Sequence, residues 1–341
     1  MTEEKILHAL DSLAENNVEV SSLIIDDNWQ SVDSQAADQS QRGWLEFQAN
    51  REAFPRGIDG TVKYIRRWHR NIRFVAVWHA MLGYWGGISP NGELAKNYKT
   101  IELDRLDPDG KHPEGDKITV IAKEDVSRFY KDFYEFLDRG RVNAVKTDAQ
   151  FMLDALTSSK ARRELSKEYF DAWILHSTHF FARRAISCMS LFPQAMFYSQ
   201  MRPSRIDCVL RTSDDYFPNE PRSHAWHVWA NAHNCIFAQY LNVIPDWDMF
   251  QTKHEFGGFH AAARCVSGGP IWITDIPGEY DFDLLQQMTG KTTRGRTAIF
   301  RPSNFGKAIN PFTGYHDDVL LKVGSYHGRL MIPSREMAWL C

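Results

Sequence analysis

The sequence predicts an α/β fold, and within that class a (β/α)8 TIM barrel with a short C-terminal β appendage. Short apolar runs recur along the chain, and most of them end in polar or acidic residues. Helical patterns lie between most of these runs, which is the βαβ arrangement of a parallel sheet. Eight runs spread over about 250 residues fit a barrel better than a doubly wound open sheet, which is the alternative.

The candidate strands are nearly continuous apolar runs, the type found where both faces of a parallel sheet are buried. Leu23–Ile25, for example, runs directly into Asp26 and Asp27, and the run at 144–147 ends at Asp148. In chain order the candidate strands lie at residues 23–25, 74–78, 118–121, 144–147, 186–190, 208–211, 243–245 and 271–274.

Helices are predicted between these runs from apolar residues spaced three and four apart. The clearest segment is 125–137, where the apolar positions are Val126, Phe129, Tyr130, Phe133 and Phe136. Further helical patterns cover residues 160–184, 223–240 and 254–266.

Two segments depart from this alternation. Residues 86–117 are rich in Gly, Pro and Asp and too long for a simple connection, so we expect an elaborated loop at the mouth of the barrel. Beyond about residue 293 the helical periodicity is lost. We therefore expect a catalytic barrel over residues 1–292 and the start of a β-rich appendage over 293–341.

Composition excludes several classes of protein. The chain has 341 residues, 43% of them hydrophobic, and a net charge of −3, which argues against a nucleic-acid partner bound through a basic field. No apolar run approaches the roughly 18 residues that would span a membrane. The N-terminus has no apolar secretory core, and the five cysteines are scattered and odd in number, so we expect a cytoplasmic setting.

Acidic residues follow the predicted strands at five ends. Any one of them is equally well explained as a turn former or a helix N-cap. All five together, with tryptophans and two cations nearby in the sequence, indicate an active site instead. The carboxyl ends of barrel strands lie at one end of the barrel and carry the active site there. The acidic residues are Asp26, Asp27, Asp148, Asp214, Asp215, Asp246, Asp248 and Asp275, and their company is Trp29, Trp78, Lys146, Arg211 and Trp247.

Paired carboxylates without metal ligands nearby favour glycoside chemistry, with no metal and no cofactor. Lys146 stands two residues before Asp148, so both side chains point to the same face of a strand. A neighbouring cation keeps a carboxylate ionised, as a nucleophile requires. Tryptophan rings would cover the apolar face of a sugar.

Several segments resemble glycoside hydrolase family 36, specifically its raffinose synthase and alkaline α-galactosidase (seed imbibition protein) branch. The resemblance runs from about residue 21 to 307, and the stretch 245–278 is specific enough to be diagnostic alone. In such enzymes a large N-terminal β-sandwich precedes the barrel, and we expect it to be absent here. The matching segments are IIDDNW (24–29), VWHAMLGYWGGISP (77–90), VKTDAQ (145–150), RTSDDYFP (211–218), PDWDMFQTKHEFGGFHAAARCVSGGPIWITDIPG (245–278) and FRPSNFGK (300–307).

The resemblance assigns catalytic roles to two residues. The K-x-D motif falls on Lys146 and Asp148, which makes Asp148 the nucleophile. The R-x-x-x-D motif falls on Arg211 and Asp215, which makes Asp215 the acid/base, with the adjacent Asp214 as the alternative.

The resemblance also implies a sugar pocket. Asp26 and Asp27 would grip the galactose 4- and 6-hydroxyls, and Arg211 would approach the 2-hydroxyl. The walls and the remainder of the pocket would come from Trp29, Trp78, Asp246, Trp247 and Asp248.

The implied function is that of a retaining enzyme acting on an α-galactosyl oligosaccharide of the raffinose family, or on galactinol or a similar donor. Water as acceptor would make it an α-galactosidase, and a sugar acceptor a galactosyltransferase. The alternative function is a catalytically impaired carbohydrate-binding or regulatory barrel.

Several histidines are set aside as metal ligands. His254 and His260 are six residues apart, which is not the spacing of a zinc helix. His224, His227 and His233 share one helical stretch and are interpreted as surface or hydrogen-bonded core residues.

Overall fold

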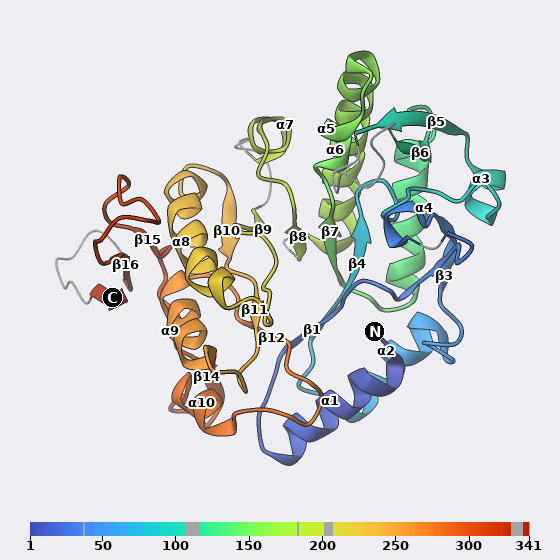
Figure 1. Cartoon of the computed structure of the whole chain (residues 1–341). Coiled ribbons are helices and arrows are strands. Elements are labelled where there is room, and N and C mark those ends of the chain that lie inside the picture. Colours follow the sequence, from blue (N-terminus) through green and yellow to red (C-terminus); the bar gives the residue numbers. More distant parts are fainter. Residues whose placement is uncertain (37, 107–115, 183, 201–206, 329–336, 341) are drawn as a thin grey trace. The chain divides into compact units, whose positions relative to one another are not determined.

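The computed structural model describes residues 1–36, 38–106, 116–182, 184–200, 207–328 and 337–340 (Figure 1). The chain divides into two compact units. The first unit comprises residues 1–7 and 20–206, and the second comprises 8–19 and 207–341. Helix α1 (Glu3–Glu15) supplies residues to both.

The first unit is organised around four parallel strands that follow one another in chain order, as predicted. The register pairs Ile25 with Val77, then Trp78 with Lys146 and Ala80 with Asp148, so functional candidates lie opposite one another. The strands are β1 (Ser22–Ile25), β4 (Phe74–Ala80), β7 (Ala144–Asp148) and β8 (Ala185–Ser187). The helices after them are α2 (Gly57–Trp68), α4 (Val126–Arg139), α5 (Met152–Ala155), α6 (Ser159–Phe181) and α7 (Pro193–Ala195), with a π-helical turn over Met196–Gln200.

One predicted barrel strand is wrong. Residues 118–121 belong to β6 (Asp116–Ile121), which pairs antiparallel with β5 (Thr100–Arg105). The run Ile-Thr-Val-Ile buries Ile118 and Val120 while Thr119 is only partly covered, the alternation of a one-sided hairpin rather than of a two-sided central strand. The hairpin and α3 (Glu93–Asn97) elaborate the segment 86–117, of which residues 107–115 lie outside the described residues.

A second antiparallel pair, not predicted from the sequence, follows β1. It consists of β2 (Gln30–Val32) and β3 (Trp44–Ala49), with a 3-10 turn at Gln39–Gln41 between them. Gly87 fits closely between this pair and the hairpin. Its φ is +74°, and a Cβ there would lie 2.1 Å from the Thr119 carbonyl oxygen, so only glycine allows the turn that carries Trp85 to pass.

The second unit repeats the strand–helix pattern. Strands β9 (Cys208–Arg211) and β10 (Val243–Asp246) are parallel and joined through α8 (Pro221–Ala238). The predicted strand at 271–274 shortens to β12 (Trp272–Ile273), parallel to β11 (Met249–Phe250), with α9 (Gly257–Ser267) between them and α10 (Phe282–Gln287) after.

The C-terminal residues form antiparallel strands, as expected from the loss of helical periodicity. These are β13 (Thr289–Lys291) with β14 (Thr297–Ile299), and β15 (Lys307–Ala308) with β16 (Val323–Tyr326) and β17 (Met337–Leu340).

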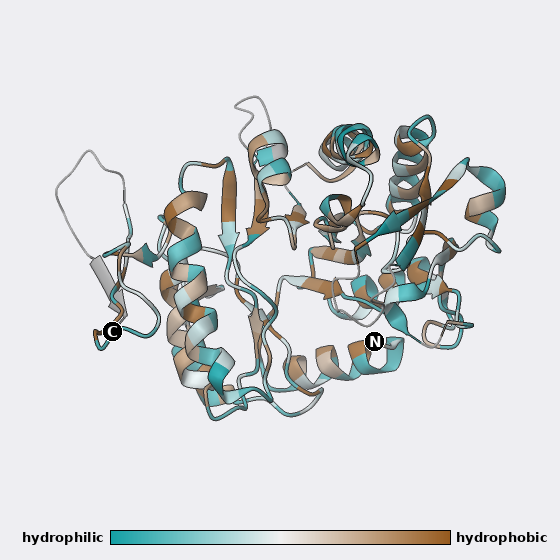
Figure 2. Cartoon of the chain, turned by 45° about the horizontal axis from the view of Figure 1, so that its top comes forward, coloured by the Kyte–Doolittle hydropathy of each residue, from teal (hydrophilic) through white to brown (hydrophobic). Residues whose placement is uncertain are grey.

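Most aromatic side chains of the first unit pack in its core. The apolar face of α4 buries Phe129 and Phe133 against Trp44, with the rings of Trp44 and Phe133 4.7 Å apart and edge to face. Truncating such a buried ring to alanine costs about 3–5 kcal/mol. Figure 2 shows how hydrophobic and hydrophilic residues are distributed over the elements. Many strands are largely hydrophobic (brown), and several helices carry hydrophobic (brown) and hydrophilic (teal) residues on different sides. Among the described helices, none is long and apolar enough to cross a membrane.

Candidate active site

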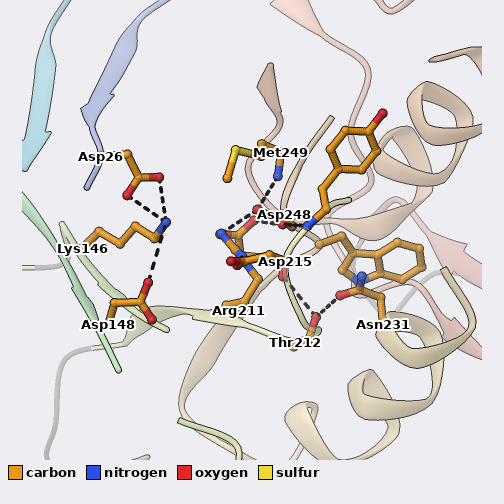
Figure 3. A network of polar contacts seen from close by, with 12 residues as sticks. Asp26, Lys146, Asp148, Arg211, Thr212, Asp215, Asn231, Asp248 and Met249 are labelled. Carbon is orange, nitrogen blue, oxygen red and sulfur yellow. Dashed lines mark hydrogen bonds and ion pairs between the residues drawn. The ribbon is translucent and has the colours of Figure 1, made fainter. Parts of the chain in front are cut away.

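The polar residues predicted at strand ends form two groups, one in each unit. In the first unit Asp26 and Asp27 follow β1, and Lys146 and Asp148 lie on β7. In the second unit Arg211 ends β9, Asp215 lies in the loop after it, and Asp246 ends β10. Figure 3 shows the contacts of Lys146 with Asp26 and Asp148 in the first group, and those around Arg211 in the second.

Lys146 is the cation of the first group. Its side chain is 4% exposed, and its Nζ donates to both carboxylate oxygens of Asp26, at 2.9 and 3.1 Å. The same Nζ lies 4.0 Å from Asp148 Oδ2, so Lys146 and Asp148 do share a face, as the two-residue spacing predicted. The lysine therefore serves two carboxylates, and its shorter contact is with Asp26.

Asp148 is held by neutral donors on both oxygens. The Trp78 indole Nε1 donates to Oδ2 at 2.8 Å, and the Ala149 amide donates to Oδ1 at 2.7 Å. Asp148 is 4% exposed. Ala149 adopts a left-handed φ of +50°, a conformation costly for a residue with a Cβ and one that recurs at functional sites. The carboxylate is therefore fixed in position and direction.

Asp27 lies in a pocket of hydrogen-bond donors that sequence reasoning missed. Trp85 Nε1 and Gln39 Nε2 donate to its Oδ2 at 2.8 and 2.6 Å. Burial raises the pKa of Asp27 above its usual range, and the hydrogen bonds from Trp85 and Tyr84 oppose that rise. Trp85 and Tyr84 stand in the segment 77–90 that carries the family resemblance, and this was the only available signal.

Trp29 has a different place from the one predicted. It is completely buried, and its Nε1 donates to the Trp78 backbone carbonyl at 2.6 Å. It therefore supports the strand that presents Trp78 and offers no ring surface to a ligand. Trp78 is itself 1% exposed, and what it presents is its Nε1 rather than a ring face.

Arg211 is the cation of the second group, and three carboxylates surround it. Its Nη2 lies 2.6 Å from Asp248 Oδ1, its Nη1 3.2 Å from Asp215 Oδ1, and its Nε 3.6 Å from Asp246 Oδ2. The Asp215 side chain is 43% exposed, while those of Asp246 and Asp248 are 1% and 0% exposed. Of the three, only Asp215 reaches solvent freely.

Asp248 fixes the position of the loop that carries Asp215 through contacts at both ends of that loop. Its Oδ1 accepts from Arg211 and its Oδ2 accepts from the Tyr216 amide at 2.7 Å, so it holds both ends of the Arg211–Tyr216 segment. Its own φ is +68°, a second left-handed residue at a strand end. The sequence predicted Asp248 as a sugar contact, but complete burial makes it a positioning residue instead.

The remaining predicted site residues, Asp214, Asp246 and Trp247, differ in their exposure to solvent. Asp214 is exposed, whereas its neighbour Asp215 pairs with Arg211. Asp246 is buried and accepts from the Asp248 amide at 2.9 Å. Trp247 lies in a core cluster with Cys235 and Val266 and is 0% exposed, so it packs the interior instead of forming a pocket wall.

Four histidines gather in the second unit, namely His224, His227, His254 and His260. His224 and His227 are buried on α8, as core residues rather than surface ones. His224 Nδ1 lies 2.7 Å from His260 Nε2, and Arg264 Nη1 lies 2.6 Å from His260 Nδ1. Burial lowers the pKa of His227 to about 4. Within the described ranges, no group of three or more His, Cys, Asp or Glu side chains is arranged to hold a metal ion.

Comparison with known protein families gives a match over most of the chain. Residues 1–303 match the family described as raffinose synthase or seed imbibition protein Sip1. Among curated proteins, the chain is 32% identical over 314 residues to a probable galactinol–sucrose galactosyltransferase 6 of Arabidopsis thaliana, covering 84% of this chain and 40% of that protein. It is 26% identical over 249 residues to a stachyose synthase of Pisum sativum, covering 68% of this chain and 29% of that protein. The chain thus spans about two fifths of the length of the first of these relatives.

Solved structures share the fold. An α-galactosidase of Thermus thermophilus in complex with stachyose aligns with a TM-score of 0.55 at 15% identity, covering 84% of this chain and 60% of that one. A GH27 β-L-arabinopyranosidase of Geobacillus stearothermophilus in complex with arabinose aligns with a TM-score of 0.56 at 11% identity, covering 96% of this chain and 78% of that one. These alignments confirm the predicted (β/α)8 fold class.

Proposed function

This chain belongs to the family of raffinose synthases and seed imbibition proteins, and from that premise we propose that it is an enzyme that cleaves α-galactosides with retention, through a covalent galactosyl-Asp148 intermediate. The observation that supports the proposal most strongly is the environment of Asp148. Its carboxylate is buried at the end of β7, is hydrogen-bonded on both oxygens, and has Lys146 4.0 Å away.

The first chemical step uses Asp148 as the nucleophile. A carboxylate oxygen of Asp148 attacks C1 of the α-galactosyl unit, and the bond from C1 to the leaving oxygen breaks. Asp215 in its protonated form gives its proton to that oxygen. The product is a β-linked galactosyl ester on Asp148, and the aglycone leaves as a neutral alcohol.

The second step reverses these roles. Asp215, now ionised, takes the proton from an incoming hydroxyl, whose oxygen attacks C1 and displaces the Asp148 carboxylate. The partial exposure of Asp215 suits a group that must release and regain a proton in each cycle. Asp215 pairs with Arg211 at 3.2 Å, and this contact supports Asp215, rather than its exposed neighbour Asp214, as the acid/base.

Sugar recognition is assigned to the polar residues around these two carboxylates. Asp26 and Asp27 would accept hydrogen bonds from galactose hydroxyls, and Lys146 and Arg211 would donate to others. Trp78 would act through its hydrogen bond to Asp148. Trp29 and Trp247 would not contact the sugar, because both rings are fully buried.

The names of the relatives suggest the substrates. We propose that the donor is galactinol or a raffinose-family oligosaccharide, and that sucrose or a related sugar is the acceptor. The scattered cysteines, odd in number, are the observation that supports a cytoplasmic setting. Hydrolysis with water as the acceptor would use the same two carboxylates.

Incubation of the protein with galactinol and sucrose tests the proposal. We expect formation of raffinose, with release of free galactose measuring the hydrolytic branch, and loss of both products in Asp148→Asn. Galactose release without raffinose would assign a hydrolase. No turnover of any α-galactoside by the unaltered chain would overturn the proposal in favour of a sugar-binding or regulatory barrel.

A further inference from the structure

A cleft of about 640 Å³ lies in the second unit, beside the loop that carries Asp215. Phe217, two residues beyond Asp215, forms one part of it, and the first turns of α8 and the C-terminal region form the rest. Its lining includes Phe217, Glu220, Arg222, Trp226 and Tyr315.

Trp226 is a rigid aromatic surface within this cleft. Its ring stacks on Trp229 with centroids 5.0 Å apart and planes 20° apart, and the Tyr315 ring meets it edge on at 5.2 Å. Trp229 is itself fixed, because it stacks on His233 at 4.1 Å and its Nε1 donates to the Thr313 carbonyl at 3.0 Å. Trp226 nevertheless stays 42% exposed, so a large hydrophobic ring is held still in contact with solvent.

The rest of the lining has the character of a sugar site. Phe217 is 49% exposed and adds a second ring, while Glu220 and Arg222 place an exposed carboxylate and guanidinium at the same cleft. Aromatic rings cover the apolar face of a pyranose, and charged groups hydrogen-bond its hydroxyls. Fixed rings bind with a smaller loss of conformational entropy than mobile ones.

The place of the cleft in the chain identifies which sugar it would take. The acid/base gives its proton to the leaving oxygen and later removes one from the acceptor hydroxyl, so the leaving and accepting sugars must lie on its side of C1. Tyr216 separates Asp215 from Phe217 and is anchored through its amide to Asp248, which ties the cleft wall to the acid/base loop.

We propose that this cleft binds the acceptor saccharide, with a pyranose ring stacked on Trp226 and hydroxyls bound by Glu220 and Arg222. The inference rests on the proposed function, since it names the acceptor subsite of the same reaction. A change in the cleft should therefore alter transfer to sugar acceptors but leave hydrolysis by water, and the attack of Asp148 on the donor, unaffected.

The experiment uses α-galactosyl fluoride as donor, because fluoride is too small to need an acceptor subsite and leaves without much acid assistance. Transfer to sucrose and hydrolysis by water are measured together in the unaltered protein, in Trp226→Ala and in Trp226→Phe. The control is Trp68→Ala, which removes a tryptophan that is 61% exposed on α2 of the first unit.

We expect Trp226→Ala to raise the KM for sucrose about tenfold, which corresponds to about 1.4 kcal/mol, while hydrolysis of the fluoride changes less than twofold. Trp226→Phe should recover part of the loss, and Trp68→Ala should have no effect. An unchanged KM for sucrose in Trp226→Ala, with transfer intact, would overturn the inference.

A binding measurement separates failure of this inference from failure of the proposed function. Sucrose is titrated into Asp148→Asn and into the double variant Asp148→Asn/Trp226→Ala, with tryptophan fluorescence and a reference titration of Asp148→Asn/Trp68→Ala. Saturable binding that weakens about tenfold only without Trp226 supports the cleft even if the unaltered protein proves inactive. Equal binding by all three proteins contradicts it.

Discussion

The two carboxylates assigned to catalysis lie in opposite kinds of surroundings. Asp148 in the first unit is 4% exposed and receives neutral hydrogen bonds on both oxygens, whereas the Asp215 side chain in the second unit is 43% exposed and pairs with the Arg211 guanidinium at 3.2 Å. A nucleophile must be ionised and aimed at one carbon, while an acid/base must exchange protons. The contrast in burial and hydrogen bonding matches that division of work.

The cations show the same contrast. Lys146 is shared by two carboxylates, those of Asp26 and Asp148. Arg211 is shared by three carboxylates, two of which are fully buried and fixed. The buried part of the second group is therefore Asp246 and Asp248 with Arg211, and Asp215 is its exposed member.

The largest effect is expected from Asp148→Asn. The amide keeps the size of the side chain but removes the nucleophile, so kcat for α-galactosyl fluoride should fall by at least about 10⁴-fold. Steady-state kinetics measure the loss, and unfolding by urea serves as the control for folding. A decrease below tenfold would remove Asp148 from the nucleophile role.

Asp215→Asn should have a smaller effect that depends on the leaving group. We expect kcat for raffinose to fall by about 10²–10⁴-fold, the usual contribution of acid–base catalysis, with far less effect on α-galactosyl fluoride. Asp214→Asn is the matched control, one residue away and exposed, and should retain activity on both substrates. If the two variants exchange these phenotypes, Asp214 is the acid/base.

Asp248→Asn tests the positioning role. Removal of a buried charge that pairs with Arg211 should lower the free energy of unfolding by about 3 kcal/mol, because Arg211 keeps its charge in a buried place. The exposed pair Asp59–Lys63 supplies the control, where Asp59→Asn should cost about 0.5 kcal/mol or less.

A purely structural Asp248 would change stability alone. If Asp248 positions the acid/base loop, Arg211 will interact more strongly with Asp215 once Asp248 is replaced, and the pKa of the Asp215 carboxyl will fall. The basic limb of the kcat profile will then move to lower pH. An unchanged pH profile would restrict Asp248 to stability.

Histidines whose pKa is lowered by burial should cost both units stability in acid. Burial lowers the pKa of His79 in the first unit and of His227 in the second to about 4. Since the unfolded chain binds a proton near pH 6.5 and the folded chain does not, stability is complete above 6.5 and falls as pH drops toward 4. Each histidine should account for about 3 kcal/mol over that range.

Urea unfolding between pH 4 and 7 measures this loss. His227→Gln should flatten the pH dependence by about the share of one histidine, whatever its effect at pH 7. An unaltered slope in the variant would show that His227 does not titrate with unfolding.

Sequence patterns located most of the strands because apolar runs that end in Asp arise where a buried strand reaches the polar edge of a sheet. The prediction of a barrel strand at residues 118–121 was wrong because a short amphipathic strand that contains a threonine has nearly the same sequence pattern as a buried strand. The positions of the candidate site residues along the chain were predictable. Their roles were less so, because burial depends on segments distant in sequence.

Asp248 and Trp85 illustrate that limit. Asp248 reaches the Tyr216 amide only through its left-handed backbone, and Trp85 reaches Asp27 only because Gly87 permits a tight turn. Neither conformation is encoded in a local apolar pattern. The same reason explains why Trp29 and Trp247 were predicted as pocket walls and are core residues.

The proposed mechanism passes through a galactosyl ester on Asp148, and trapping that ester tests the mechanism. The protein is incubated with 2-deoxy-2-fluoro-α-galactosyl fluoride, which slows hydrolysis of the intermediate, and the modified peptide is located by mass spectrometry. We expect one added fluorogalactosyl group on the peptide that contains Asp148, and no such group in Asp148→Asn. An adduct on another carboxylate, or turnover of the unaltered protein without any adduct, would contradict it.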